Sequence, residues 1–365
     1  MLNQNERKLI LEQGVSFEKA GEWAAAYDFW VHCTKVDPCE IRFLIRQASA
    51  ALRIRKPESA IEAIVRAQRL DAKSTHSEDL ENLQQRAKSL LKSMLRIQGV
   101  QAYDAGDFDS ARISFETLAE LDPNHPWAKY RAISASGLAP SFADRLKAEL
   151  PAVKQRIFLT GCGRSGTWLF TAMLSCIEGI RIPEKEEPLG AFLEKANEPR
   201  IHLIKRLHNA FLHFDKVPNE IKIIHIVRHP FDVLISHHLD KPNYISLARL
   251  EAEHAMYFKH LAERPNTLVI KYEDMVGAPN TVQQRVEKFL HLKAARPFRE
   301  FYLKAAIEDN VAKAMHGLRP LDVSTLHRWR VDNQAKDYLK ALLKESDGTL
   351  QLFADAFGYD INLIE

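Results

Sequence analysis

The segment TGCGRSGTW (160–168) has residue types and spacing suited to binding an anion. It follows a short apolar run at 156–159 and precedes an apolar helical pattern. A strand, a glycine-rich turn and a helix direct backbone N–H groups and the positive end of the helix toward an anion. Ser165 and Thr167 add hydroxyl donors, and Arg164 adds a cation. The segment therefore predicts a phosphate-binding loop.

The loop differs from that of enzymes that bind nucleoside triphosphates. Gly161 and Gly166 have the spacing of the pattern GxxxxGK[ST], but Thr167 and Trp168 stand where lysine and serine or threonine belong. The cation is instead Arg164, inside the loop. We therefore expect a ligand with one 5′-phosphate and a neighbouring charged group, not a metal-bound triphosphate. The alternative is a glycine-rich turn that only closes a strand–helix corner.

A second basic position follows the apolar run 221–227, where the chain reads RHPFDVLIS. Arg228 is expected at the carboxyl end of a strand, where open α/β sheets bind ligands. Pro230 suits the first position of a helix, and Ser236 is expected almost two turns along it. An arginine and a hydroxyl can bind a phosphate dianion. The segment predicts a second anion site.

Both motifs resemble those of sulfotransferases that use 3′-phosphoadenosine 5′-phosphosulfate (PAPS). RSGT is similar to their 5′-phosphosulfate loop and RxPxDxxxS to their 3′-phosphate motif, and the resemblance covers roughly residues 155–360. It implies PAPS as the co-substrate, release of the desulfated nucleotide PAP, and no metal. The implied cofactor-binding residues are Gly163, Arg164, Ser165, Gly166, Thr167, Trp168, Arg228, Ser236, Tyr272, Arg328 and Trp329.

Three of these residues lie in two further segments that are similar to the same family. KYEDM (271–275) is similar to the family's YED motif, which places Tyr272 behind the 3′-phosphate. STLHRWR (324–330) is similar to a mobile segment that covers the cofactor in many bacterial members. By that resemblance Arg328 reaches the 3′-phosphate and Trp329 the adenine. The alternative for this last segment is a solvated basic face with one packed tryptophan.

Sulfuryl transfer is an in-line displacement that depends on positioning and charge stabilisation. We expect Arg164 to stabilise charge on the departing phosphate. Lys205, at the end of the apolar run IHLIK, is a second candidate, because sulfotransferases often carry a lysine there.

The acceptor also needs a general base. Tyrosylprotein-type and several other sulfotransferases use a glutamate about twenty residues after the loop arginine. Here Glu184 and Glu186 straddle that position, and Glu187 is a weaker candidate. The cytosolic branch uses a histidine two residues past the strand lysine, a position that Leu207 occupies in this chain. His208, one place further, is the remaining candidate.

The elements that position these residues are predicted from alternating apolar runs and amphipathic stretches. Short runs rich in Ile, Leu and Val occur at 156–161, 201–205, 221–228 and 266–272. Amphipathic stretches follow at 168–178, 231–239, 245–263 and 280–292. This alternation predicts an α/β fold, a P-loop-type parallel sheet sandwiched by helices, similar to that of sulfotransferases.

An internal repeat precedes this part of the chain. Ala26 and Ala60 are 34 positions apart, and so are Asp37 and Asp71. A third unit carries Gly106, Ala111, Phe115 and Asp122-Pro123, after a longer helical segment at about 76–95. The units resemble tetratricopeptide repeats, the alternative being an ordinary antiparallel helical domain. We predict an all-α repeat domain over 1–140, a linker over 141–154 and a sulfotransferase domain over 155–365.

Composition sets limits on the partners. The 365 residues carry a formal net charge of +3, with 46% hydrophobic and 27% charged residues, which gives no reason to expect nucleic acid or a membrane surface as a partner. The N-terminal residues MLNQNERKLILEQG lack the apolar core of a signal peptide, and no run of eighteen apolar residues occurs, so we expect neither a signal peptide nor a membrane span. Its four cysteines are too few for a disulfide framework and have no metal-ligand spacing, so we expect a cytoplasmic protein.

Two other functions stay open. One is a P-loop kinase-like phosphotransferase, which would need the missing loop lysine. The other is a non-enzymatic adaptor, with the repeats as its binding surface and a degenerate nucleotide-binding domain. The acceptor is open among carbohydrate, peptide, lipid and small molecule. The repeats are expected to recruit the acceptor or a protein partner, or to mediate self-association.

Overall fold

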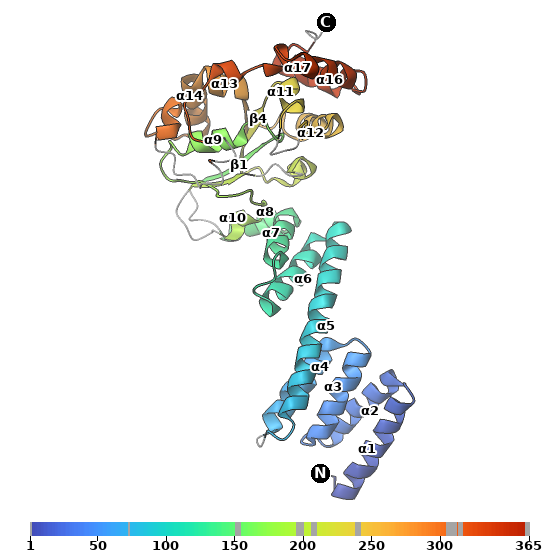
Figure 1. The fold of residues 1–365 in the computed structure, drawn as a ribbon. Helices are drawn as coiled ribbons and strands as arrows, with labels where there is room; N and C mark the ends of the chain where they lie inside the picture. Colours follow the sequence, from blue (N-terminus) through green and yellow to red (C-terminus); the bar gives the residue numbers. More distant parts are fainter. Residues whose placement is uncertain are drawn as a thin grey trace. The chain divides into compact units, whose positions relative to one another are not determined.

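The computed structural model forms two compact units, Met1–Ala132 and Ile133–Glu365 (Figure 1). The structure describes residues 2–71, 74–149, 155–194, 201–205, 210–237, 242–303, 312 and 317–361. Each unit is described by itself below.

The first unit consists of antiparallel helices in which each helix packs mainly on the next. Its helices are α1 (Gln4–Lys19), α2 (Trp23–Val36), α3 (Ile41–Arg53), α4 (Pro57–Leu70), α5 (Ser77–Asp104), α6 (Phe108–Leu121) and the start of α7 (Ala128–Leu138). The longer helix expected near 76–95 is α5, with 28 residues. The three alanines that share a repeat position, Ala26, Ala60 and Ala111, are fully buried.

The repeat is visible in two equivalent helix contacts. A Cβ atom at Gly14 of α1 would overlap the ring of Trp30 in α2, and one at Gly99 of α5 would overlap the ring of Phe115 in α6. Both pairs are offset by 85 positions, the offset that separates the two Asp-Pro sequences. In each helix pair a glycine therefore makes room for a buried aromatic side chain.

The second unit is built on a parallel sheet with strand order β2-β3-β1-β4-β5. The strands are β1 (Gln155–Gly161), β2 (Ile180–Arg181), β3 (Ile201–Lys205), β4 (Lys222–Val227) and β5 (Thr267–Lys271). The four apolar runs correspond to β1, β3, β4 and β5. The two-residue β2 is too short to give a sequence pattern.

Helices cover both faces of this sheet. Successive side chains of a strand point to opposite faces, so Ile157 and Leu159 pack with α9 (Thr167–Leu174) and α14 (Pro279–Leu290). Phe158 packs on the other face, with α10 (Ala191–Glu194), the 3₁₀ helix η1 (Ala210–Lys216) and α12 (Leu247–His260). The predicted α/β fold, a parallel sheet sandwiched by helices, is confirmed.

Helix α8 (Phe142–Glu149) belongs to the second unit. Phe142 and Leu146 are buried in the same cluster as Phe158. The chain divides after Ala132, within α7. Part of the segment expected as a linker over 141–154 is therefore a packed helix, whose apolar side chains close one face of the sheet.

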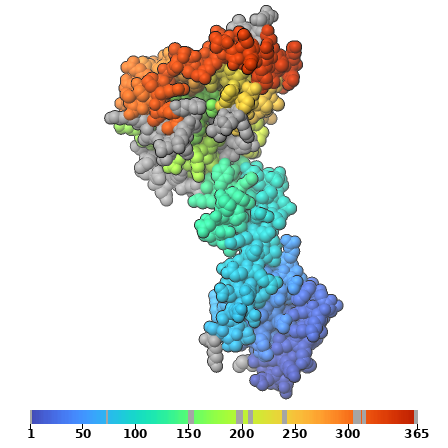
Figure 2. Space-filling view, in the orientation of Figure 1, coloured from blue at the N-terminus to red at the C-terminus, as the bar shows by residue number. Residues whose placement is uncertain are grey.

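A third cluster lies beyond the carboxyl end of β4. There α11 (Pro230–Leu234) and α12 pack with α16 (Asn333–Leu343) and α17 (Thr349–Phe357). Figure 2 shows α16 and α17, in red, on the surface above α12, in yellow.

Within the described residues, no helix is both long enough and apolar enough to cross a membrane.

Candidate functional site

The site lies at the carboxyl ends of β1 and β4, which are neighbours in the sheet. From β1 the chain continues to β2 and β3 on one side, and from β4 it continues to β5 on the other. Open α/β sheets bind ligands in the crevice at such a switch in direction. Gly161 of β1 is paired with Ile226 of β4. Arg164 and Arg228 follow these two positions closely, so the fold brings the two predicted anion sites together.

The phosphate loop connects β1 to α9 through two residues in left-handed conformations. Arg164 has φ +70° and Gly166 has φ +94°. A Cβ atom at Gly166 would overlap the ring of Tyr272, the first residue of α13 (Tyr272–Gly277). Position 166 therefore needs glycine for both its backbone angle and its contact. Arg164 is an uncommon residue at positive φ, a conformation that is enriched at ligand sites.

The two arginines are in contact. Arg228 donates a hydrogen bond from Nη1 to the backbone carbonyl of Arg164, at 3.0 Å. The guanidinium of Arg228 also lies over the ring of Tyr272, 4.3 Å from its centroid. Burial lowers the pKa of Arg164, and the charge of Arg228 lowers this pKa further. Within the described part of the chain, no carboxylate forms an ion pair with either guanidinium. The pair therefore concentrates positive charge.

Several buried donors of this site have no hydrogen-bond partner among the described residues. They are Thr160 Oγ1, Arg164 Nε, Ser165 Oγ and Arg228 Nε. Buried polar groups are normally hydrogen-bonded, and these four lie on the loop and at the end of β4. An anionic ligand supplies acceptors for such donors. The residues present therefore fit a nucleotide with a phosphate or phosphosulfate group.

Lys205, the second predicted catalytic cation, lies in the same layer at the end of β3. Its side chain is fully buried, its Nζ is 3.0 Å from Glu186 Oε1, and it lies 3.8 Å from the centroid of the Trp168 ring. Burial lowers the pKa of Lys205, an effect that Glu186 opposes. The structure thus brings together the strand lysine, one candidate base and the first turn of α9.

The segment that carries the glutamates is fixed by its neighbours. Glu187 accepts two hydrogen bonds from Arg181, each of 2.9 Å, and its backbone N–H donates to the carbonyl of Lys205 at 3.0 Å. Glu187 is therefore occupied in holding the segment. Glu184 is exposed, whereas the Glu186 side chain is 33% exposed and reaches Lys205. His208 lies outside the described residues.

Ser236 has a different position from the one predicted. Helix α11 ends at Leu234, so Ser236 lies past its end instead of almost two turns along a helix. Its hydroxyl donates to the carbonyl of Val233 at 2.7 Å. Because this bond uses the hydroxyl proton, Ser236 can accept a hydrogen bond from a ligand but cannot donate one. Pro230 is at the first position of the helix, as expected.

The segment that contains Arg328 and Trp329 lies against α11. Trp329 is 1% exposed and packs against Phe231 and His229, with ring centroids 5.0 and 5.3 Å apart. This burial corrects the expectation that Trp329 faces adenine, because protein side chains cover the indole. Arg328 is exposed. The geometry agrees with the alternative stated for this segment, a basic face with one packed tryptophan.

Two groups of supporting residues were missed from the sequence. Glu273 accepts from the backbone N–H of His229 at 2.9 Å and from the hydroxyl of Tyr359 at 2.8 Å, which fixes the residue after Arg228. Its place in the YED sequence was a usable signal. Arg249 and Glu253 of α12 lie behind the loop and form an ion pair with an N–O distance of 2.9 Å. No sequence motif marks this pair.

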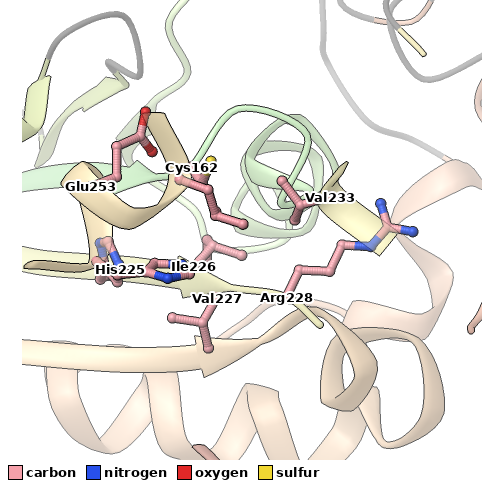
Figure 3. Close-up of a pocket in the computed structure, with 9 residues that line it drawn as sticks. Cys162, His225, Ile226, Val227, Arg228, Val233 and Glu253 are labelled. Carbon is pink, nitrogen blue, oxygen red and sulfur yellow. The ribbon is translucent and has the colours of Figure 1, made fainter. Parts of the chain in front are cut away.

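A small pocket lies between the loop and α12 (Figure 3). Cys162 and Glu253 line it together, and burial raises the pKa of both, most strongly that of the thiol. The guanidinium of Arg228 points away from Glu253 (Figure 3). The carboxylate therefore does not neutralise the charge of the site. In the part of the chain that the structure describes, no three metal-ligating side chains gather.

Comparison with solved structures finds eight similar chains, among them two sulfotransferase domains. One is the sulfotransferase domain of the olefin synthase from Synechococcus PCC 7002, with a TM-score of 0.44 and 17% identity, over 57% of this chain and 96% of that domain. The other is the sulfotransferase domain from the curacin biosynthetic pathway, with a TM-score of 0.43 and 15% identity, over 57% of this chain and 99% of that domain. No family model matches the chain, and a search of curated proteins finds no match.

Proposed function

We propose that the chain transfers a sulfuryl group from PAPS to an acceptor hydroxyl or amine and releases PAP. The observation that carries this proposal is the contact between Arg228 and the carbonyl of Arg164, with Tyr272 against both the loop and Arg228. It places two cations that lack a carboxylate partner among the described residues side by side at one edge of the sheet. PAPS has two anionic groups on one adenosine and matches this charge.

The loop and the end of β4 take separate parts in this proposal. Ser165, Thr167 and the first N–H groups of α9 bind the 5′-phosphosulfate, as helix N-termini bind anions. Arg228 binds the 3′-phosphate. Arg328 is exposed beside α11 and is proposed to reach the same phosphate. Tyr272 holds the guanidinium of Arg228 in place through its ring.

In the transfer itself, the acceptor oxygen or nitrogen forms a bond to sulfur while the bond from sulfur to the 5′-phosphate oxygen breaks. Both electrons of the broken bond stay with the departing phosphate, where Arg164 and Lys205 balance the charge. We propose Glu186 as the base that takes the acceptor proton, because it lies 3.0 Å from Lys205 at the sheet edge.

The test is a comparison of nucleotide binding and group transfer. Isothermal titration with PAP and with ATP–Mg²⁺ measures which nucleotide the protein binds more tightly. Incubation of ³⁵S-labelled PAPS with cell-extract metabolites and polymers reveals the acceptor. We expect PAP to bind more tightly and label to move to one acceptor class. Tighter ATP–Mg²⁺ binding would favour a phosphotransferase. Tight PAP binding without any turnover would favour the adaptor.

The first unit is proposed to recruit the acceptor or to mediate assembly. Its helix pairs form a stack, an architecture that presents extended binding surfaces. Light scattering of the full chain separates self-association from recruitment, since only self-association changes the mass without an added partner.

A further inference from the structure

One buried carboxylate joins the Arg228 site to the segment that carries Arg328, here called the Arg328 segment (317–330). Asp232, in α11, is 2% exposed. Its Oδ2 atom accepts a hydrogen bond from the backbone N–H of His327 at 3.1 Å. This bond connects positions 95 residues apart in the sequence.

Aromatic contacts surround this bond. The ring of His229 lies 5.3 Å from that of His327 and 5.3 Å from that of Trp329. Phe231 packs edge-on against Trp329. His327 has φ +56°, so its left-handed backbone turns the chain at the point where Asp232 binds it. Arg328 lies between two anchored residues and is itself exposed.

The charge of the surroundings explains why a carboxylate is needed here. Burial lowers the pKa of His229 most, and the charges of His327, Arg330 and Arg228 lower it further, to about 4. The Arg328 segment therefore brings further positive charge toward Arg228 at the end of β4. The second oxygen of Asp232, Oδ1, is buried and has no hydrogen-bond partner among the described residues. A buried carboxylate offsets the repulsion that would otherwise separate the basic segment from the end of β4.

We propose that Asp232 is a positioning residue that fastens the Arg328 segment to the end of β4, so that Arg328 and Arg228 are held for the same nucleotide phosphate. The inference rests on the proposed function for its ligand. The anchoring itself does not depend on the ligand. Asp232 touches no substrate in this arrangement and acts through the His327 backbone.

Hydrogen exchange of the full chain, read by mass spectrometry over 322–331, tests the anchoring without nucleotide. Asp232→Ala should speed exchange in this peptide about tenfold or more, because the hydrogen bond that the His327 backbone donates to the carboxylate is lost. Asp232→Asn keeps an acceptor but removes the charge, so its exchange should lie between that of the wild type and that of Asp232→Ala. Asp332→Ala is the matched control, since Asp332 caps α16 by accepting from Ala335 at 3.0 Å and does not reach α11. Should the alanine variant fail to fold, Asp232→Ser, whose hydroxyl is too short to reach His327, replaces it.

Titration with PAP tests the coupling. Asp232→Ala should weaken binding about fivefold, Arg328→Ala should weaken it similarly, and the double variant should be no weaker than Arg328→Ala alone. If the losses of PAP affinity in the two single variants add in the double variant, the coupling is overturned. Effects of residues that act through one contact do not add. Unchanged exchange in Asp232→Ala would overturn the anchoring. Faster exchange in a protein that binds ATP–Mg²⁺ but not PAP would support the anchor, refute the proposed function, and overturn the link to a PAP phosphate.

Discussion

The guanidinium of Arg228 lies 3.0 Å from the backbone carbonyl of Arg164, so the end of β4 holds the phosphate loop as well as carrying a charge beside it. The two arginines are 64 residues apart in the sequence. The parallel pairing of β1 and β4 brings them together, and Arg228 can act on the loop and on a ligand at once.

Replacing Arg228 with lysine should weaken PAP binding by about tenfold or more, although the charge is kept. Lysine cannot reproduce the planar fork that bonds the Arg164 carbonyl and stacks on Tyr272, and that is proposed to bind the 3′-phosphate. Titration calorimetry of Arg228→Lys and Arg228→Ala measures this loss. Arg299→Ala is the control, because Arg299 is exposed and its ion-pair partner is Glu300. Wild-type affinity in Arg228→Lys would contradict the dual role.

Replacing Gly166 with alanine should weaken PAP binding by about tenfold or more, since alanine would have to adopt φ +94° and would overlap Tyr272. Titration with PAP measures the change. Gly277→Ala is the matched control, because a Cβ atom there meets open space and its backbone has no positive φ. Equal affinities of the two variants would show that the loop shape is not needed.

Among the candidate bases, Glu186→Gln should lower kcat about a hundredfold or more and leave the PAP dissociation constant nearly unchanged. Glu184→Gln, a change on an exposed side chain of the same segment, should have a small effect. Single-turnover rates with labelled PAPS separate chemistry from product release. If Glu184→Gln is the more damaging change, the base assignment moves to that residue.

The activity should fall as pH rises through the pKa of Lys205. Burial lowers this pKa from its ordinary value of about 10.4, and only the protonated lysine can balance charge on the leaving phosphate. The alkaline limb of kcat/KM should therefore lie below that of an ordinary lysine. Lys205→Met should be slow at every pH and should lack this limb. A limb of unchanged position in Lys205→Met would assign it to another group.

The second unit should lose stability as pH falls below about 6.5. Burial lowers the pKa of His225 and of His254 to about 3 each, so below 6.5 the unfolded chain binds protons that the folded chain does not. Linkage then costs about 1–2 kcal/mol per histidine by pH 5. Calorimetric unfolding from pH 7 to pH 5 measures the loss. His254→Phe should flatten the dependence, and exposed His237→Gln should leave it as steep as in the wild type.

The strands and the loop could be predicted because each leaves a local pattern. Four apolar runs correspond to β1, β3, β4 and β5, and the glycine at 166 stands where the backbone requires it. The placement of both arginines at one edge of the sheet followed from the rule that parallel strands place their carboxyl ends together, but the direct contact between them was not predicted. These features depend on spacing within a few residues or on sheet topology.

The remaining features depend on tertiary packing. Nothing near Trp329 in the sequence shows that Phe231, almost a hundred positions earlier, covers its ring. Ser236 was misplaced because α11 ends after five residues, and no proline or glycine marks that end. The pairing of Lys205 with Glu186 likewise depends on the backbone hydrogen bond from Glu187 to Lys205, which leaves no pattern in the sequence.

The paired contacts of Gly14 with Trp30 and of Gly99 with Phe115 have an evolutionary consequence. Because each helix of the first unit packs mainly on its successor, duplication or loss of one hairpin leaves the remaining interfaces intact. The number of hairpins can thus differ between descendants of a common ancestor without any change in the second unit.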